Sequence, residues 1–335
     1  MRIMSGMRPT GRLHLGHYFG ALTNWVAFQK DYESYFSIVD WHALTTKYQD
    51  VSEIKSNIFE IALDWLCVGI DPDQATIYVQ SGVPEIAELH LLLSMITRQN
   101  WVEREPTLKD MVKMLAADQE EAKERVTYGL IGYPVLMSAD ILAFKGELVP
   151  VGKDQESHLE FARNLARKFN GLYEVDYFPE PKPRFTSTPL LKGMDGQKMG
   201  KSYNNDVKIA DTPDDTIKKI SKAITDRTRV ARSDPGHTDL CEVPWPLYRV
   251  FADAELQSTV KTECESAQIG CVDCKKRLAV VVNEFFAPFR EKREALARDP
   301  EKVRKILEHG NKKARAVAGS TLRDVREIMG LTNWA

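Results

Sequence analysis

The segment Pro9-Thr10-Gly11-Arg12-Leu13-His14-Leu15-Gly16-His17 stands between a short apolar run, Ile3-Met4-Ser5, and a stretch with helical spacing that reaches Lys30. The same alternation of strand and helix continues along the first half of the chain. The apolar runs that predict further strands are Tyr35–Val39, Thr76–Val79 and Leu148–Val151. Alternating strands and amphipathic helices favour an α/β fold with a Rossmann-like parallel sheet covered on both faces. Ligands of such sheets bind at the carboxyl ends of the strands.

The quoted segment therefore lies where a ligand is expected. A helix that begins there offers free backbone N–H groups and a partial positive charge to a phosphate. Gly16 lets a flat ligand approach the backbone, and His14 and His17 could donate to the same phosphate oxygens. Two alternatives stay open: a helix start with two surface histidines, and a metal-binding histidine pair, although no third ligand stands nearby in the sequence.

The second half has a different texture. From Pro179 to Lys201, prolines and glycines predict a long loop, and the chain then reads as mostly helical. The last stretch, Pro300 to Met329, is expected to form two helices broken near Gly310. The second half therefore predicts an all-α region after the sheet.

Composition limits the functions that the chain can have. Hydrophobic residues make up 43% of the 335 residues, enough to bury a core without disulfides. No run of about 18 apolar residues and no secretory signal occur, so we expect a cytoplasmic protein without membrane spans. The net charge of −2 means that any contact with RNA must use local basic clusters. The clusters are Arg227, Arg229 and Arg232; Lys275, Lys276 and Arg277; and Lys312, Lys313 and Arg315.

A second motif, Lys198-Met199-Gly200-Lys201-Ser202, lies in the predicted loop. Two lysines on a loop can close over a triphosphate and neutralise the charge that develops on it. The ending Gly200-Lys201-Ser202 also matches the end of a P-loop, but the glycine required five residues earlier is replaced by Asp195. We therefore favour a closing loop over a P-loop, with a solvated basic loop as the remaining alternative.

The two motifs together resemble the HIGH and KMSKS signatures of class I aminoacyl-tRNA synthetases. Three further segments resemble tryptophanyl-tRNA synthetases: Val39–Ala43, Tyr133–Leu142, and Val149–Gln155 followed by His158-Leu159-Glu160. The resemblance extends along most of the first two hundred residues. It implies catalytic roles for His14, His17, Lys198 and Lys201. It also implies that ATP with Mg²⁺ contacts Arg8, Pro9, Thr10, Gly16, His17, Gly152, Lys153, Asp154, Lys198, Met199, Gly200, Lys201 and Ser202.

The chemistry of two residues agrees with tryptophan as the substrate. Met137 and Asp140 are three apart, so on a helix they share a face. A carboxylate accepts the one N–H of indole, and a thioether packs on the ring. By resemblance, Met4 and Val151 line the indole pocket, and His42, Tyr133 and Gln155 reach the amino or carboxylate group. Met4 and Arg8 depart from the aromatic residue and the glutamine that many relatives carry, and tyrosine remains the alternative substrate.

Four of the five cysteines, Cys241, Cys264, Cys271 and Cys274, gather within a short stretch. In a reducing cytosol they predict a four-thiolate site for zinc or a [4Fe–4S] cluster, with four free thiols as the alternative. The spacing of the four cysteines resembles that in a subset of bacterial tryptophanyl-tRNA synthetases that carry a [4Fe–4S] cluster. This resemblance favours the cluster over zinc. Cys67 stands apart and is expected in the core.

The resemblance also implies an organisation for the whole chain. It comprises a catalytic domain over residues 1–188, rejoined by C-terminal helices over 291–335, a mobile KMSKS loop over 189–204, and a helical anticodon-binding domain over 205–290 that holds the cysteines. L-tryptophan, tRNA(Trp) and a second copy of the chain in a homodimer are the expected partners. Two other classes stay open: a non-catalytic iron–sulfur RNA-binding paralogue, and an iron–sulfur redox protein.

Overall fold

The computed structural model describes residues 1–115, 125–151, 156–185 and 191–331. Its centre is a five-stranded sheet in the order β3-β2-β1-β4-β5, with every neighbouring pair parallel. The strands are β1 (Arg2–Met7), β2 (Glu33–Ile38), β3 (Ala75–Val79), β4 (Leu148–Val151) and β5 (Lys182–Phe185). The predicted Rossmann-like parallel sheet is thereby confirmed, and four of its strands lie where the apolar runs predicted them.

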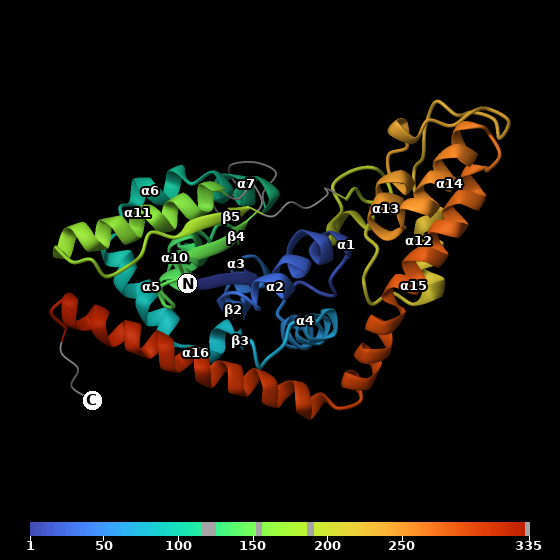
Figure 1. The fold of residues 1–335 in the computed structure, drawn as a ribbon. Coiled ribbons are helices and arrows are strands. Elements are labelled where there is room, and N and C mark those ends of the chain that lie inside the picture. The colour runs from blue at the N-terminus through green and yellow to red at the C-terminus, as the bar shows by residue number, and fades with distance from the viewer. Residues whose placement is uncertain (116–124, 152–155, 186–190, 332–335) are drawn as a thin grey trace.

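Helices connect the strands and cover both faces of the sheet (Figure 1). They are α1 (Leu15–His17), the π-helical turn η1 (Tyr18–Leu22), α2 (Thr23–Phe28), α3 (Asp40–Lys47), α4 (Ile54–Val68), the 3₁₀ turn η2 (Gln80–Gly82), α5 (Glu85–Ile96), α6 (Gln99–Arg104), α7 (Pro106–Leu115), α9 (Tyr128–Ile131), α10 (Tyr133–Leu142) and α11 (Glu156–Tyr173). The helix expected from Gly16 to Lys30 is thus three consecutive pieces, α1, η1 and α2.

The two faces of the sheet carry separate apolar clusters. On one face, Trp25 of α2 stacks on Phe36 of β2 with ring centroids 4.6 Å apart, and Trp65 of α4 packs edge-on against Trp25. On the other face, β-strand side chains such as Tyr35 and Tyr78 pack with α5, α10 and α11. Both faces of the strands are therefore apolar, as a doubly covered parallel sheet requires.

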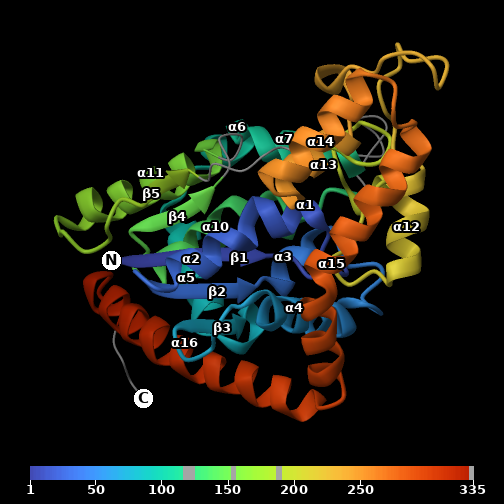
Figure 2. The ribbon, with the colours of Figure 1, turned by 45° about the vertical axis from the view of Figure 1, so that its right-hand side comes forward.

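The chain after the sheet is helical, as expected. It contains η4 (Lys201–Tyr203), α12 (Pro213–Ser221), η5 (Thr238–Leu240), α13 (Pro244–Phe251), α14 (Ala254–Glu265), α15 (Cys271–Ala297) and α16 (Pro300–Ile328). Helices α12 to α14 stand to one side of the sheet, and α15 passes α4 before the chain turns into α16 (Figure 2). Helix α16 then runs back along β3. No break occurs at residue 290, because α15 continues through it. Among the described residues, no helix has the length and apolarity to cross a membrane.

Two expectations about this half of the chain are wrong. Residues 182–185, expected in a loop, form β5 despite Pro183, because an edge strand leaves one side free of ladder hydrogen bonds. The stretch from Pro300 to Ile328 is one helix and not two. Gly310 lies inside it, and a Cβ there would stand 1.7 Å from the carbonyl oxygen of Ile77 in β3. The glycine serves a close approach of helix to strand and does not end the helix.

We predict that Gly310→Ala lowers the free energy of unfolding by about 1–3 kcal/mol or more, because the added methyl group must push α16 off β3. The matched control is Gly319→Ala on the same helix, where the nearest atom would be 3.8 Å from the new Cβ. That change should raise stability by about 0.5–1 kcal/mol, since alanine favours helix over glycine. Urea unfolding of both variants measures the difference, and equal midpoints would contradict the close contact.

Candidate active site

The carboxyl ends of the central strands meet at one edge of the sheet. Strand β1 leads into Arg8, β2 into Asp40 and α3, and β3 into the η2 turn at Gln80. A cavity of about 420 Å³ opens beside these ends. Seven of the predicted site residues line it: Met4, Arg8, His42, Tyr133, Met137, Asp140 and Val151. The sequence analysis did not predict five others that line it: Met7, Gly20, Trp25, Thr45 and Met111. The structure thus brings together all the described residues that were assigned to the indole pocket.

Asp140 is the buried charge of this cavity. It lies on α10 with 3% of its surface exposed. His42 Nε2 lies 2.8 Å from its Oδ2, and the side-chain amide of Gln80 donates to both carboxylate oxygens at 2.8 and 2.9 Å. Met137, one turn earlier, lines the same cavity. As a carboxylate, Asp140 is fixed in orientation and retains lone pairs for one more donor.

Gln80 was missed in the sequence. Its side chain is fully buried, and its Oε1 accepts the backbone N–H of Trp41 at 3.0 Å. Asn311 of α16 supports the same turn, because its Oδ1 accepts the backbone N–H of Val79 at 2.9 Å. The one available signal was position: a polar residue that directly follows a buried parallel strand stands at the edge where ligands bind.

His14 and His17 form one unit at the start of α1. His14 Nδ1 accepts the N–H of Gly16 at 3.1 Å, and His17 Nδ1 accepts the N–H of His14 at 3.3 Å. A neutral ring that accepts at Nδ1 carries its proton on Nε2, so both rings hold an Nε2–H as a donor. A Cβ at Gly16 would stand 2.9 Å from His14 Cε1, which explains the glycine between the rings.

Both rings are neutral near neutral pH. Burial lowers the pKa of His14 to about 4, with Lys201 adding to the shift and Asp206 opposing it. Burial also lowers the pKa of His17 well below its ordinary value, helped by His14 and Lys201. The pair therefore offers hydrogen-bond donors to an anion and not formal charges.

Lys201 joins the two predicted motifs. Its Nζ donates to the carbonyl oxygen of Gly11 at 2.6 Å, across 190 residues of sequence. Gly11 has a φ of +112°, a conformation that favours glycine. Burial lowers the pKa of Lys201 to about 8, while Asp206 and Asp64 oppose the shift. The ammonium group thus already lies over the first motif, where a phosphate is expected.

The rest of the second motif is shaped by Asn205, another residue that the sequence did not reveal. Its Oδ1 accepts the N–H of Gly200 at 2.9 Å, and its Nδ2 donates to the carbonyl oxygen of Lys198 at 3.1 Å. The Lys198 side chain is exposed, whereas Met199 is buried beside Gly16. Only the 3₁₀ turn η4 follows, and it ends at Asn204 with a φ of +50°, so the helix that a P-loop requires is absent from this described segment.

The remaining predicted residues of the ATP site are only partly described. Thr10 is exposed and donates its backbone N–H to the carbonyl of Arg8 at 2.8 Å, which turns the chain sharply after β1, and Pro9 is buried. Gly152, Lys153, Asp154 and Gln155 lie outside the described residues, as do the first residues of the 189–204 loop. The side chain of Ser202 lies outside them too. The roles assigned to these residues stay predictions.

The four cysteines come from separate elements of the helical region. Cys241 follows η5, Cys264 lies in the last turn of α14, and Cys271 and Cys274 open α15. Burial raises the pKa of Cys241 to about 11, and the neighbouring thiols of Cys264 and Cys271 add to the shift. All four cysteines lie at or next to the ends of short or long helices of the helical region.

The four cysteine thiols are not arranged as the ligands of a metal ion. Over the described ranges, which include all four thiols and both histidines of the first motif, no three His, Cys, Asp or Glu side chains form a group that could hold a metal. A Cβ at Gly236 would stand 2.5 Å from Cys264 Sγ, so a glycine leaves room beside that sulfur. The donor set and this space fit a metal centre, but the geometry does not show one. Cys67 is buried in α4, as predicted.

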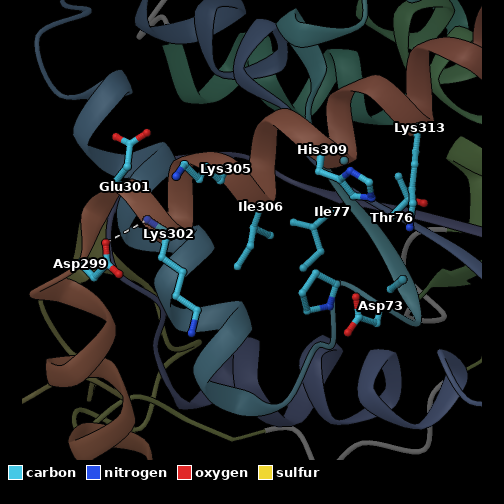
Figure 3. Close-up of a pocket in the computed structure, with 13 residues that line it drawn as sticks. Asp73, Thr76, Ile77, Asp299, Glu301, Lys302, Lys305, Ile306, His309 and Lys313 are labelled. Atoms are coloured by element: carbon cyan, nitrogen blue, oxygen red, sulfur yellow. Dashed lines mark hydrogen bonds between the residues drawn. The ribbon is translucent and has the colours of Figure 1, made fainter.

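A second cavity, of about 440 Å³, lies between β3 and α16 (Figure 3). Lys302, Lys305 and His309 of α16 line it together with Asp73 and Thr76, which lie before and in β3. Gly310 and Ile77, which approach each other closely, are among its lining residues, as is Lys313 of the third basic cluster. None of the residues assigned to ATP, tryptophan or the metal lines it.

Comparisons with known proteins identify the family of the chain. The family model described as tRNA synthetases class I (W and Y) matches residues 1–287. The tryptophan–tRNA ligase of Thermotoga maritima is 45% identical over 333 residues, 99% of each chain, and that of Aquifex aeolicus is 38% identical over 396 residues, 99% of this chain and 100% of the other. The structure of Campylobacter jejuni tryptophanyl-tRNA synthetase with ADP and tryptophan superposes with a TM-score of 0.89 at 35% identity, over 99% of this chain and 100% of the other. The chain belongs to the class I tRNA synthetases of the tryptophan and tyrosine family.

Proposed function

We propose that this protein is a tryptophan–tRNA ligase, which activates L-tryptophan with ATP and transfers it to the 3′ end of tRNA(Trp). One observation carries the proposal: a buried carboxylate, Asp140, oriented by His42 and Gln80, faces a cavity beside the predicted phosphate motif. Similarity to tryptophan–tRNA ligases over nearly the whole chain supports it.

The cavity is suited to an indole ring. Met4 and Met137 give it polarisable walls, and the carboxylate of Asp140 accepts the indole N–H. A phenylalanine-like ring would leave the buried carboxylate without its donor, at a cost of about 1–3 kcal/mol or more. Tyrosine, the alternative substrate, presents a hydroxyl group that can also donate, so shape must exclude it. The named tryptophan ligases among the relatives favour tryptophan.

The first step is an attack of the tryptophan carboxylate on the α-phosphate of ATP, which enters with Mg²⁺. The products are tryptophanyl-adenylate and pyrophosphate, and no protein nucleophile is required. The Nε2–H groups of His14 and His17 donate to phosphate oxygens, and Lys201 neutralises charge that develops on them. Lys198, exposed on the same loop, is placed to add a second positive charge when the loop closes. A ribose hydroxyl of the tRNA then attacks the carbonyl carbon of the adenylate, which forms the tryptophanyl ester, breaks the bond to phosphate and releases AMP.

We predict that Lys201→Ala slows formation of the adenylate by about 10²–10³, the scale of losing one preorganised donor. The matched control is Lys218→Ala on α12, because Lys218 is 74% exposed and pairs loosely with Asp215 at 4.0 Å. Single-turnover pyrophosphate release with tryptophan measures both. Unchanged rates in Lys201→Ala would remove the lysine from the reaction, and absent turnover in the wild-type protein would refute the proposed function.

The protonation of Lys201 gives a second prediction. Its pKa of about 8 means that the free enzyme loses this positive charge as the pH rises through that value. The kcat/KM for ATP, which reports ionisations of the free enzyme, should therefore fall above pH 8. In Lys201→Arg the fall should move to a much higher pH, since guanidinium stays protonated. A fall at the same pH in both proteins would assign it to another group.

We further propose a cytoplasmic homodimer that binds tRNA with the helical region. Support for self-association comes from exposed apolar side chains of neighbouring helices: Leu91 and Met95 of α5 are 53% and 68% exposed, and Tyr128 of α9 is 77% exposed. Arg232 pairs loosely with Asp273 at 3.8 Å and is 74% exposed, as an RNA-facing residue would be. The predicted division into residues 1–188, the loop 189–204 and the helical region from 205 is part of this proposal, whereas the limit predicted at 290 falls inside α15.

The four cysteines are proposed to hold a [4Fe–4S] cluster, with Zn²⁺ as the alternative. Four thiols that influence one another, in a chain similar to tryptophan–tRNA ligases, support the proposal. Such a cluster would tie α14 and the start of α15 to the segment at Cys241. Its expected role is to hold the helical region for tRNA and not to transfer electrons.

Protein purified without oxygen should contain iron and acid-labile sulfide in about four-to-four stoichiometry per chain. Cys271→Ser should lose most of both and should weaken tRNA charging, while tryptophan-dependent pyrophosphate exchange persists. Cys67→Ser serves as the control, because Cys67 lies in α4 away from the other four. One zinc per chain would replace the cluster with a zinc site, and metal-free protein with full tRNA charging would refute both.

A further inference from the structure

Arg293, near the end of α15, forms ion pairs with two carboxylates of α4. Its Nε donates to Asp64 Oδ1 at 2.8 Å, and its Nη2 donates to Glu60 Oε2. The Asp64 side chain is fully buried and that of Arg293 is 13% exposed. Lys292 adds a third bond, from its Nζ to the carbonyl oxygen of Leu66 in the last turn of α4, at 2.6 Å. The two helices are therefore fastened by charge-assisted hydrogen bonds, which are stronger than neutral ones.

Each of the two carboxylates also holds the segment that precedes His14. Asp64 Oδ2 accepts the backbone N–H of Leu13 at 3.1 Å, and Glu60 Oε2 accepts from Arg12 Nε at 2.6 Å. Arg12 and Leu13 lead directly into His14. A single guanidinium group thus fixes, through two carboxylates, two consecutive residues of the predicted phosphate-binding segment.

The charge of Asp64 also reaches the second motif. Burial lowers the pKa of Lys201, and the carboxylate of Asp64 is one of the charges that opposes this shift. Asp206 also raises the pKa of Lys201, and Lys208 lowers it. Lys201 in turn lowers the pKa of His14 and of His17. Asp64 therefore acts on both predicted motifs, on one by a hydrogen bond and on the other by its charge.

We propose that Arg293 and Asp64 are positioning residues through which α15 sets the geometry of the ATP-binding segment. The proposal rests on the ATP-dependent activation proposed above and adds a connection between its two halves. Cys271 and Arg293 belong to the same helix, α15, which contains Pro288 and places them roughly 33 Å apart along its axis, so a shift at the cysteine end can reach Arg293 through one element. Binding of tRNA to the helical region would thereby change the position of Arg12 and Leu13 and, with them, the position of His14.

Two conservative variants test the proposal in the full chain. Arg293→Lys keeps the positive charge, but one ammonium group cannot span both carboxylates as the guanidinium does. Asp64→Asn keeps an acceptor for Leu13 and removes the negative charge. Arg298→Lys is the matched control, because Arg298 pairs with Glu294 on the exposed surface of the chain. Each protein is assayed for pyrophosphate exchange with ATP and tryptophan varied in turn, and for its thermal midpoint.

We expect both variants to raise the KM for ATP or lower kcat by about 10- to 10²-fold, the scale of a misplaced binding group, while the KM for tryptophan changes less than about twofold. The double variant should lose less than the product of the single losses, because the two residues act as one unit. Asp64→Asn should also move the alkaline fall in kcat/KM to lower pH, since Lys201 loses a stabilising charge. A purely structural residue would not shift that pH.

Wild-type ATP parameters and an unshifted pH profile in folded variants would overturn the proposal. So would equal losses for ATP and tryptophan that follow the thermal midpoint. Calorimetric titration with ATP alone separates this outcome from a failure of the proposed function. If the wild-type protein binds ATP but shows no tryptophan-dependent exchange, the proposed function fails. The positioning role then holds only if Arg293→Lys and Asp64→Asn weaken ATP binding and Arg298→Lys does not.

Discussion

A carboxylate that is removed from water must be hydrogen-bonded, and Asp140 places this requirement at the centre of the molecule. Its partners come from elements far apart in the sequence: His42 after β2 and Gln80 after β3. They can meet only because parallel strands bring their carboxyl ends to one edge of the sheet. The order of the strands therefore determines where this buried carboxylate can stand.

The second half of the chain maintains this edge from outside. Asn311 of α16 caps the end of β3, next to the Gln80 that orients Asp140. Arg293 of α15 acts through Asp64 on the backbone before His14. The amino acid cavity and the phosphate segment are thus each supported by one C-terminal helix. The close approach of Gly310 to β3 is what allows α16 to lie near enough for the first of these supports.

Much of this arrangement could be predicted from the sequence, because its signals are local. Apolar runs predicted four strands, and the spacing of Met137 and Asp140 predicted a shared helical face. Prolines and glycines predicted the loop that carries the two lysines, and the contact from Lys201 to Gly11 joins that loop to the first motif.

The rest depends on partners that are distant in sequence. Nothing near Gln80 or Asp64 distinguishes them from ordinary polar residues, since their partners stand 60 and 229 positions away. Gly310 was misinterpreted for the same reason, because the strand that requires it lies outside its own neighbourhood. Pro183 indicated a loop, since its sheet position on an edge cannot be seen from local propensity.

The central claim is that Asp140 reads the indole N–H, and a substrate analogue tests it without altering the protein. ATP–pyrophosphate exchange should be compared for tryptophan and for its benzothiophene analogue, which has nearly the same shape but carries sulfur in place of the N–H. The account predicts that kcat/KM falls by about 10² or more, because the buried carboxylate is left without its donor. Exchange within a few-fold of tryptophan would contradict it and would leave shape alone as the basis of recognition.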